Sequence, residues 1–343
     1  SSRDKFNHAV SVFDSSSGTL TVSTLAGTSE EGTTDGKGSL AEFSYPSAIA
    51  IMGYYAHLAV TTINCVKLIT ISTKDVATVA GDCNAWGDDD GAGAAARFSS
   101  PAGLLVVGPD VFVSDSLNNK IRTIMSFLSS ATVTTFAGPA AGSTASGSTN
   151  GIGAAARFNN PTGLAAFASP GYMYVVDQGN FKIRSVNLAT VATADVAGSG
   201  ANANTDGIGA AAAFAFTAYA NQMATDDVFL YVFSDNALRR IDPVGGTVST
   251  VAGTGVAGTS DNTDNLLATF YGPWGIGVVG TSLVVADSYY GKIRQITGVV
   301  LLTTTTQTAT LTSAPSTTSA TSATATTTAS STLTFTTPTV TAA

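Results

Sequence analysis

The chain repeats one sequence pattern five times, and this repeat limits the folds open to it more than any other feature. Val-Ala-Gly or a close equivalent ends at five positions, 54, 57, 60 and 55 residues apart: Gly27, Gly81, Gly138, Gly198 and Gly253. A period of this length indicates a repeated unit of several secondary-structure elements. We therefore expect one architecture built from similar units.

Each unit has the same internal order. A small-residue loop with an Asp-Gly or Asn-Gly step comes first, followed by an Ala-x-Phe step, a proline and short β-prone runs. In the second unit these runs are Gly103 to Val107, Val111 to Asp115, Lys120 to Ile124 and Thr132 to Ala137. Four short strands rich in Val, Ile and Phe, separated by Gly, Asp and Asn, are typical of a propeller blade. The sequence thus predicts an all-β fold, a β-propeller of four-stranded antiparallel blades.

The two ends of the repeat region decide the predicted number of blades. His8 to Phe13 and Thr19 to Ala26 match the outer strands of a blade, and Val299 to Thr304 with Thr308 to Thr312 would supply its inner strands. We expect six blades, with a split closing blade made from both termini, because a closed ring leaves no exposed sheet edge. The alternative is a five-bladed ring in which Thr19 to Ala26 completes the last blade.

The C-terminal segment differs from the repeats in composition. Residues 303–343 contain 20 Thr and 6 Ser, and no charged residue follows Arg294. Such a mucin-like segment lacks the large apolar side chains that offset the entropy of ordering. We therefore divide the chain into a propeller at residues 1–302 and an extended Thr/Ser-rich stalk or linker at residues 303–343, whose first residues would add a closing strand.

Dense O-linked sugars would protect this uncharged, β-prone segment from aggregation. We therefore expect O-glycosylation and a secreted, extracellular or cell-surface protein. The candidate acceptors are Thr303, Thr304, Thr305, Thr306, Thr308, Thr310, Thr317, Thr318, Thr326, Thr327 and Thr328.

The two cysteines flank one predicted hairpin. Cys65 precedes the run Val66 to Ile71, Cys83 follows the run Val76 to Ala80, and the turn between them centres on Lys74. Residues at these positions lie opposite one another in a hairpin, at a spacing that suits a disulfide. A Cys65–Cys83 bridge agrees with an extracellular location.

Three segments carry a more specific pattern: Val113 to Ile124 (VSDSLNNKIRTI), Val175 to Val186 (VVDQGNFKIRSV) and Val285 to Ile296 (VADSYYGKIRQI). Together with the Asp-Gly-x-Gly, Ala-x-Phe and proline steps, this pattern resembles the NHL-repeat β-propeller family. The first unit departs from it with Thr61-Thr62, and the fourth lacks the proline. The resemblance implies the fold, but the family includes enzymes, sensors and interaction modules.

Charged residues recur at fixed places in the repeat. The aspartates Asp115, Asp177, Asp235 and Asp287 end the second runs, and the arginines Arg122, Arg184, Arg239 and Arg294 lie in the third runs. A residue needed once per active site is not repeated in every blade, whereas repeated polar positions specify a repeat. We interpret these residues as structural.

The sequence offers little material for chemistry. His8 and His57 are the only histidines, and no Gly-x-Ser-x-Gly step is present. The acidic run Asp88 to Asp90 matches no known calcium loop, so we interpret it as a solvated loop. We therefore expect no catalytic residue, no cofactor and no metal site.

Charge and hydropathy limit the partners. The 15 Lys and Arg residues are dispersed and the net charge is −8, so nucleic acid is not an expected partner. No apolar stretch approaches the ~20 residues that span a bilayer.

In a four-stranded blade, the connection between the second and third strands and the connection between blades leave on the same face. This face would present a contact surface, with the candidates Trp86, Asp88, Asp89, Asp90, Asn118, Asn119, Phe181, Tyr289 and Tyr290. We expect a non-catalytic extracellular structural or interaction glycoprotein that self-assembles through propeller and tail into a surface filament or lattice. The alternatives are a ligand-sensing or adhesion ectodomain and a propeller lyase or hydrolase.

Overall fold

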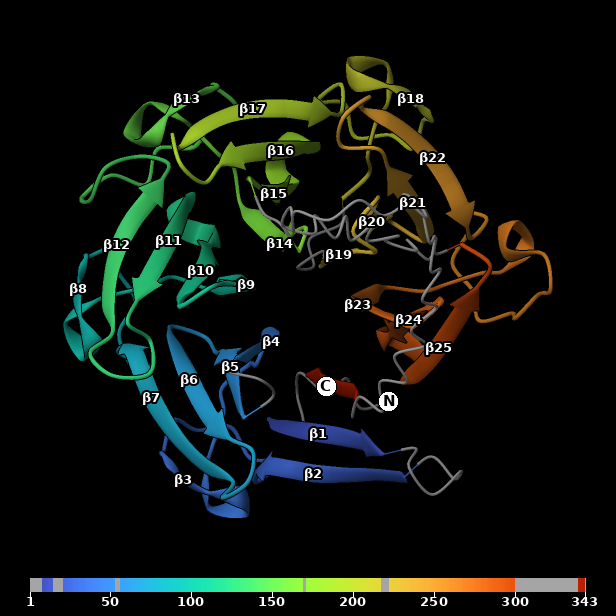
Figure 1. Cartoon of the computed structure of the whole chain (residues 1–343). Coiled ribbons are helices and arrows are strands. Elements are labelled where there is room, and N and C mark those ends of the chain that lie inside the picture. The colour runs from blue at the N-terminus through green and yellow to red at the C-terminus, as the bar shows by residue number, and fades with distance from the viewer. Residues whose placement is uncertain are drawn as a thin grey trace, which may run out of the picture.

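Figure 1 shows the computed structural model, which describes residues 8–14, 21–52, 56–168, 171–216, 222–299 and 339–342. Antiparallel sheets stand around a common axis. The predicted all-β propeller with antiparallel sheets is confirmed.

Five sheets are built from contiguous parts of the chain, and we call them blades one to five. Blade one contains β3 (Gly36–Lys37), β4 (Ala48–Met52), β5 (His57–Thr61), β6 (Cys65–Thr70) and β7 (Asp75–Gly81). Blade two contains β8 (Gly91–Ala92), β9 (Pro101–Val107), β10 (Asp110–Asp115), β11 (Lys120–Met125) and β12 (Thr132–Ala137). Blade three contains β13 (Gly151–Ile152), β14 (Pro161–Ala166), β15 (Tyr172–Asp177), β16 (Lys182–Asn187) and β17 (Ala192–Ala197). Blade four contains β18 (Gly207–Ile208), β19 (Met223–Thr225), β20 (Leu230–Ser234), β21 (Ala237–Ile241) and β22 (Thr247–Ala252). Blade five contains β23 (Pro273–Val279), β24 (Ser282–Asp287) and β25 (Lys292–Thr297).

The four longer strands of blades one to four pair in chain order from the axis outward, and the two-residue strand pairs with the outermost one. Short 3-10 helices occupy the connections: η2 (Gly38–Leu40), η3 (Gly93–Ala95), η4 (Ser116–Asn118), η5 (Gly153–Ala155), η6 (Gln178–Asn180), η7 (Gly209–Ala211), η8 (Asn265–Leu267) and η9 (Ser288–Tyr290). In blades one to four the incoming connection therefore passes over the outer edge of the blade before it enters the inner strand.

A smaller terminal sheet joins the two ends of the described chain. In it, β1 (Ala9–Asp14) pairs on one side with β2 (Thr21–Gly27) and on the other with β26 (Thr339–Ala342). Because β26 contacts both β23 and β4, this sheet fills the sector between blade five and blade one (Figure 1).

The blade number corrects the sequence-based expectation. The structure has five blades, which is the alternative that the sequence left open, together with the terminal sheet. The expected closing blade of six is wrong because β1 takes Thr339–Ala342 as its inner partner. Of the residues expected to supply the inner strands of that blade, only Val299 is described, and residues 300–312 lie outside the described part. The expectation that Thr19 to Ala26 completes the last blade is also wrong, since β2 pairs with β1 and not with β25.

The hydrophobic core lies between neighbouring blades. One buried cluster joins Val66 and Ala80 of blade one to Val111 and Ile124 of blade two. The phenylalanines of the Ala-x-Phe steps are at most 1% exposed: Phe43, Phe98, Phe158, Phe214 and Phe270. Because both faces of a blade pack against other blades, the middle strands are apolar on both faces.

Inner strands approach each other closely at the axis, and glycine permits this. A Cβ at Gly103 of β9 would lie 2.2 Å from the carbonyl oxygen of Thr162 in β14. Gly275 of β23 lies at the same place in blade five, but there a Cβ would meet only the Ala286 side chain, at 3.6 Å.

We therefore expect Gly103→Ala to lower the free energy of unfolding by about 1–3 kcal/mol, because overpacking forces the strands apart. The matched variant Gly275→Ala should change it by less than about 0.5 kcal/mol. Chemical denaturation of both variants measures the difference. Equal effects would contradict the close approach of β9 and β14.

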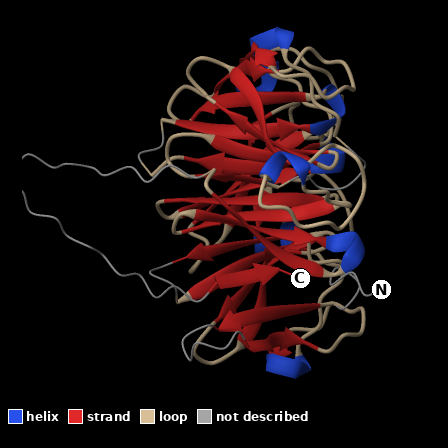
Figure 2. Cartoon of the chain, turned by 90° about the vertical axis from the view of Figure 1, so that its right-hand side faces the viewer, coloured by secondary structure: helices blue, strands red, loops and turns tan. Residues whose placement is uncertain are grey.

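The 3-10 helices gather on one side of the ring, on the right in Figure 2. This side carries the connections between second and third strands and those between blades. The predicted sharing of one face by these connections is therefore confirmed, and we call it the long-loop face.

Candidate functional site

The repeated cations are buried on the long-loop side, where each anchors a blade connection. Arg122 of β11 is fully buried. Its Nη1 lies 2.7 Å from Asp115 Oδ2, and its Nη2 lies 2.7 Å from Asp90 Oδ1. Its guanidinium carbon lies 5.3 Å from the ring centroid of Phe98. A single side chain thus joins the third strand, the second strand and the incoming loop, and we call this arrangement the arginine anchor.

The arginine anchor recurs with local exchanges. Arg184 pairs with Asp177 at 2.7 Å and with Asn150 Oδ1 at 2.6 Å, and Asp195 of β17 supplies the second carboxylate. In blades two and four the loop supplies that carboxylate and the fourth strand supplies a threonine that donates to it. In blade three, therefore, the carboxylate comes from the fourth strand (Asp195) and the loop supplies an amide (Asn150).

Blade five and blade one hold variants of the anchor. Arg294 binds Asp287 at 3.0 Å and Asp261 at 2.7 Å. In blade one Lys67 replaces the arginine and binds Asp35 at 2.7 Å, while Thr62 stands where the second-strand aspartate should be. Blade one therefore lacks the fully buried ion pair of blades two and three.

Asp235 is not one of the structural aspartates, contrary to the expectation from the sequence. In blade four the second strand ends at Ser234, whose hydroxyl accepts the Ala215 N–H at 2.7 Å and donates to Asn204. Asp235 follows in the turn at φ 49°, and Arg239 instead binds Asp206 at 2.7 Å. Burial raises the pKa of Asp235. In blade four the position of the second-strand aspartate is thus occupied by Ser234, one residue earlier than expected.

Burial raises the pKa of two anchor aspartates, Asp115 and Asp177. Burial raises the pKa of Asp115 to about 6, although the charge of Arg122 and the hydrogen bonds from Asn118 and Ser99 oppose this rise. Burial raises the pKa of Asp177 in the same way. These residues are engaged by arginine and amide donors, and their positions repeat, which is the pattern of a structural ion pair and not of an acid-base catalyst.

The acidic run in the first blade connection is mostly engaged by the fold. Asp88 accepts from Lys120 Nζ at 2.6 Å and from the Gly142 N–H at 2.9 Å, and Asp90 pairs with Arg122. Burial acts to raise the pKa of Asp88, but the hydrogen bond and charge of Lys120, the Gly142 N–H and the charge of Arg122 together outweigh it, and the net pKa is lowered. Asp89 is exposed. In the described residues no group of three or more His, Cys, Asp or Glu side chains has a geometry that would hold a metal ion.

Some of the expected contact residues are exposed in the structure, and others are partly buried. Trp86, Tyr289 and Tyr290 expose 77%, 39% and 48% of their surface. Asn119 is half-buried and links blades two and three, since its Oδ1 accepts the Asn160 N–H at 2.7 Å. Phe181 is partly buried against the core between blades three and four.

Asn118 does not belong to the contact surface, contrary to the expectation from the sequence. It is 4% exposed, and its amide donates to Gly87 O at 2.6 Å and to Asp115 Oδ2 at 2.9 Å. Asn180 makes the same two kinds of bond in blade three. A loop position suggested exposure, but this asparagine fastens the loop to the anchor.

Three tyrosines gather where blade five departs from the repeat. Tyr271 stacks on Tyr289 with ring centroids 3.9 Å apart, and Tyr290 lies 5.7 Å from Tyr271. Tyr290 stands in the place of the buried Asn118, at the third residue of the corresponding 3-10 helix. We call these three residues the tyrosine cluster. Tyr271 was missed by sequence reasoning. The signal was available, because it follows the Ala-x-Phe phenylalanine where blades two and three have Ser99 and Asn159.

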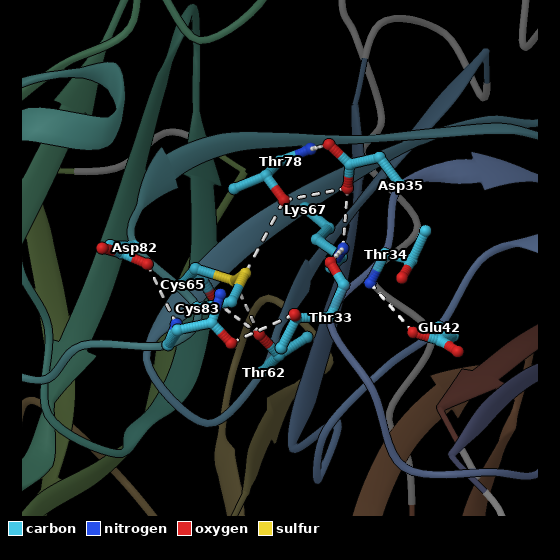
Figure 3. Close-up of a disulfide and its surroundings, with 11 residues drawn as sticks. Thr33, Thr34, Asp35, Glu42, Thr62, Cys65, Lys67, Thr78, Asp82 and Cys83 are labelled. Atoms are coloured by element: carbon cyan, nitrogen blue, oxygen red, sulfur yellow. Dashed lines mark hydrogen bonds and ion pairs between the residues drawn. A yellow bond between two sulfur atoms is a disulfide. The ribbon is translucent and has the colours of Figure 1, made fainter.

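The expected disulfide is present. Cys65 and Cys83 are bonded, with their Cα atoms 4.8 Å apart, at the end of the β6–β7 hairpin (Figure 3). Thr62 Oγ1 lies 2.9 Å from Cys65 Sγ, and Thr78 Oγ1 lies 3.6 Å from Cys83 Sγ. A disulfide is typical of proteins outside the cytoplasm.

All the threonines expected to carry sugars lie outside the described residues, so their modification stays a prediction. In the described part of the chain, no helix has the length and apolar character needed to cross a bilayer.

Comparisons with known proteins support the fold. Neither a protein-family model nor a curated protein matches the sequence, so the resemblance to NHL repeats is not confirmed as membership. A chain of a nidogen/laminin complex is similar over 85% of this chain and 93% of its own, at 11% identity and a TM-score of 0.50. At that identity the likeness shows the fold alone.

Two Bacteroides thetaiotaomicron structures are also similar. One, described as a protein of unknown function, is 21% identical over 80% of this chain and 74% of its own, with a TM-score of 0.47. The other, described as an auxiliary nutrient binding protein, is 16% identical over 79% and 74%, with a TM-score of 0.48.

Proposed function

We propose that the chain is a non-catalytic extracellular interaction glycoprotein whose propeller is a rigid contact platform, and that it is a subunit of a surface filament or lattice. The observation that carries this proposal is the tyrosine cluster. A repeat keeps a position polar and buried when it serves the fold, so an exposed aromatic group at such a position has another use.

The chemistry of the long-loop face supports a role in binding another molecule rather than in catalysis. Its recurring acids and cations are paired with each other inside the anchors, and among the described residues Trp86, Tyr289 and Tyr290 are exposed aromatic groups of this face. Aromatic side chains supply large contact area at low entropic cost and are enriched in interfaces. The disulfide supports the extracellular location, and the Thr-rich composition supports the glycoprotein assignment.

Two measurements on the native protein test the proposal. Immunogold electron microscopy of intact cells should place the chain in extracellular filaments or lattices, and the intact mass should exceed the 34.4 kDa polypeptide mass. Detection only inside the cell, at the polypeptide mass, would overturn the proposal.

The tyrosine cluster itself is tested by substitution. The double variant Tyr289→Ala and Tyr290→Ala should weaken binding to the native surface material at least about tenfold, because exposed aromatic anchors carry a large share of interface energy. The double variant Leu40→Ala and Ile152→Ala, at exposed sites 73% and 66% accessible near the outer rim, is the matched control and should bind like the wild type. Equal binding by both variants would exclude the cluster as the contact.

A ring stack open to solvent also favours a second candidate, an adhesion ectodomain that binds a glycan. Stacked tyrosines present flat faces to the C–H groups of a sugar. A glycan array probed with the purified chain separates the two candidates: selective glycan binding that Tyr289→Ala abolishes favours adhesion, and no binding favours a structural partner.

A further inference from the structure

The outer edge of blade five differs from the outer edges of the other blades. In blades one to four a long fourth strand covers the third strand, in the pairs β6–β7, β11–β12, β16–β17 and β21–β22. In blade five β25 pairs with β24 on one side, and none of the strands in the described ranges pairs with its other side. Figure 1 shows β25 at the periphery of the ring.

The missing strand leaves an apolar side chain uncovered. Ile293 of β25 is 41% exposed, while its counterparts Val66, Ile121, Ile183 and Leu238 are 0% exposed. Each counterpart is paired with an alanine of the fourth strand: Ala80, Ala137, Ala197 and Ala252. The site at Ile293 therefore fits a strand with a small residue at that position.

The missing strand also leaves a carboxylate oxygen without its usual donor. In blade one Asp35 Oδ2 accepts the Thr78 N–H at 2.8 Å, and in blade four Asp206 Oδ2 accepts the Thr250 N–H at 3.0 Å. Asp261 takes this place in blade five. Its Oδ1 binds Arg294, its side chain is 84% exposed, and its Oδ2 accepts no hydrogen bond from the described residues.

The Ile293 and Asp261 positions together indicate which residues a strand at this edge should carry. The threonine and the alanine are two residues apart in Thr78-Val79-Ala80, Thr135-Phe136-Ala137 and Thr250-Val251-Ala252. Residues 300–338 contain four Thr-x-Ala steps and no charged residue: Thr312–Ala314, Thr318–Ala320, Thr321–Ala323 and Thr327–Ala329. The first and third of these contain no threonine that we expect to carry a sugar.

We propose that the open edge of β25 is a strand acceptor, and that a second copy of this chain occupies it with a Thr-x-Ala strand of its Thr-rich segment. In blades one, two and four the Thr-x-Ala step begins eight to ten residues after the third strand ends, but the first such step after β25 begins 15 residues after Thr297. The sequence spacing after β25 therefore differs from that of the complete blades, and a strand from a second copy does not depend on this spacing. Main-chain hydrogen bonds along an edge supply the affinity, and the Asp261 and Ile293 positions supply the specificity.

This inference rests on the proposed function, because it supplies the joint between subunits of a filament. The resulting contact is head-to-tail: the propeller of one copy binds the Thr-rich segment of the next. A contact of this kind that does not close on itself produces a fibre.

The test compares two third-strand variants of the full-length chain by analytical ultracentrifugation over a range of concentrations. Ile293→Lys places a charge on the open edge, and Met125→Lys places one at a 40% exposed position of the covered strand β11. We expect the wild type to associate as concentration rises, Ile293→Lys to weaken the association at least about tenfold, and Met125→Lys to change it by less than about twofold.

A peptide competitor provides a second measurement that does not depend on the folding of a variant. The heptapeptide of residues 132–138, a natural fourth strand, should lower the mass of the wild-type assembly when added in excess, and the same peptide with Ala137→Lys should not. A monomeric wild type at every concentration would overturn the proposal, and so would equal effects of the two lysine variants or of the two peptides. Assembly of Ile293→Lys like the wild type would overturn the acceptor site alone and leave the filament proposal standing.

Discussion

Replacing Arg122 with methionine is expected to lower the free energy of unfolding at pH 7 by about 3–5 kcal/mol, since removal of one partner of a buried pair leaves an uncompensated charge. Asp115 is fully buried, and Arg122 is its cation at 2.7 Å. The guanidinium also donates to the carbonyl oxygens of Arg97 at 3.0 Å and Asp89 at 2.8 Å, which fix the incoming loop. The variant therefore loses the ion pair and the loop attachment together.

The deficit of this variant should depend on pH in a defined direction. Burial raises the pKa of Asp115 to about 6, above the ~4 of an unfolded aspartate. The native state thus binds this proton more tightly than the unfolded chain, so the stability that the group contributes is present at low pH and is lost as pH rises from about 4 to about 6. Without Arg122 the pKa of Asp115 rises further. The deficit of Arg122→Met relative to the wild type should therefore be smaller at pH 5 than at pH 7.

Two controls separate the buried charge from lost packing. The double variant Arg122→Met and Asp115→Asn removes both charges and should recover at least about half of the deficit at pH 7. Arg240→Met, at a partly exposed arginine that packs on the Phe229 ring, should cost less than about 1 kcal/mol. Urea denaturation at both pH values measures all four proteins. A single-variant loss below 1 kcal/mol, or a double variant as unstable as the single one, would contradict the anchor.

The sequence predicted the repeating part of the molecule well because the residues that define the repeat follow one another at fixed, short sequence spacings. The strand period, the Ala-x-Phe step and the Lys-Ile-Arg step each mark one position of a blade, and the structure places the phenylalanine and the arginine together. Asp235 shows the limit of such spacing. Blade four has two residues between Ser234 and Ala237, whereas blade two has four between Asp115 and Lys120, so the shorter turn shifts the structural position by one residue.

Long-range pairing and hydrogen-bond direction could not be predicted in the same way. The blade number depends on the pairing of β1 with Thr339–Ala342, more than 300 residues away, and no local pattern encodes it. Asn118 was expected to be exposed because it lies in a connection, but its amide turns inward to Gly87 and Asp115. The open edge of β25 became visible only by comparison of blade five with its complete neighbours.

Removal of the Cys65–Cys83 disulfide should lower the free energy of unfolding by about 3 kcal/mol in the chain-entropy account, given the separation of 18 residues. The bridge stands in blade one, which like blade four lacks the buried ion pair: Thr62 replaces the second-strand aspartate and Lys67 replaces the arginine. Lys67 binds Asp35, whose carboxylate is 44% exposed. We infer that the covalent bond takes over the role of the missing anchor in holding β6, β7 and the following loop together.

The double variant Cys65→Ala and Cys83→Ala tests this role, because alanine adds no polar group at the buried Cys65 site. The wild type in excess reductant should match the variant in stability, and the Arg122→Met effect in blade two should be unchanged in the variant background, since distant sites add. Hydrogen exchange should rise first in β6 and β7 and remain slow in β11 and β12, because the bridge closes a loop within blade one alone. A loss below about 1 kcal/mol, or exchange that rises equally in both blades, would show that the hairpin is held by its packing and not by the bridge.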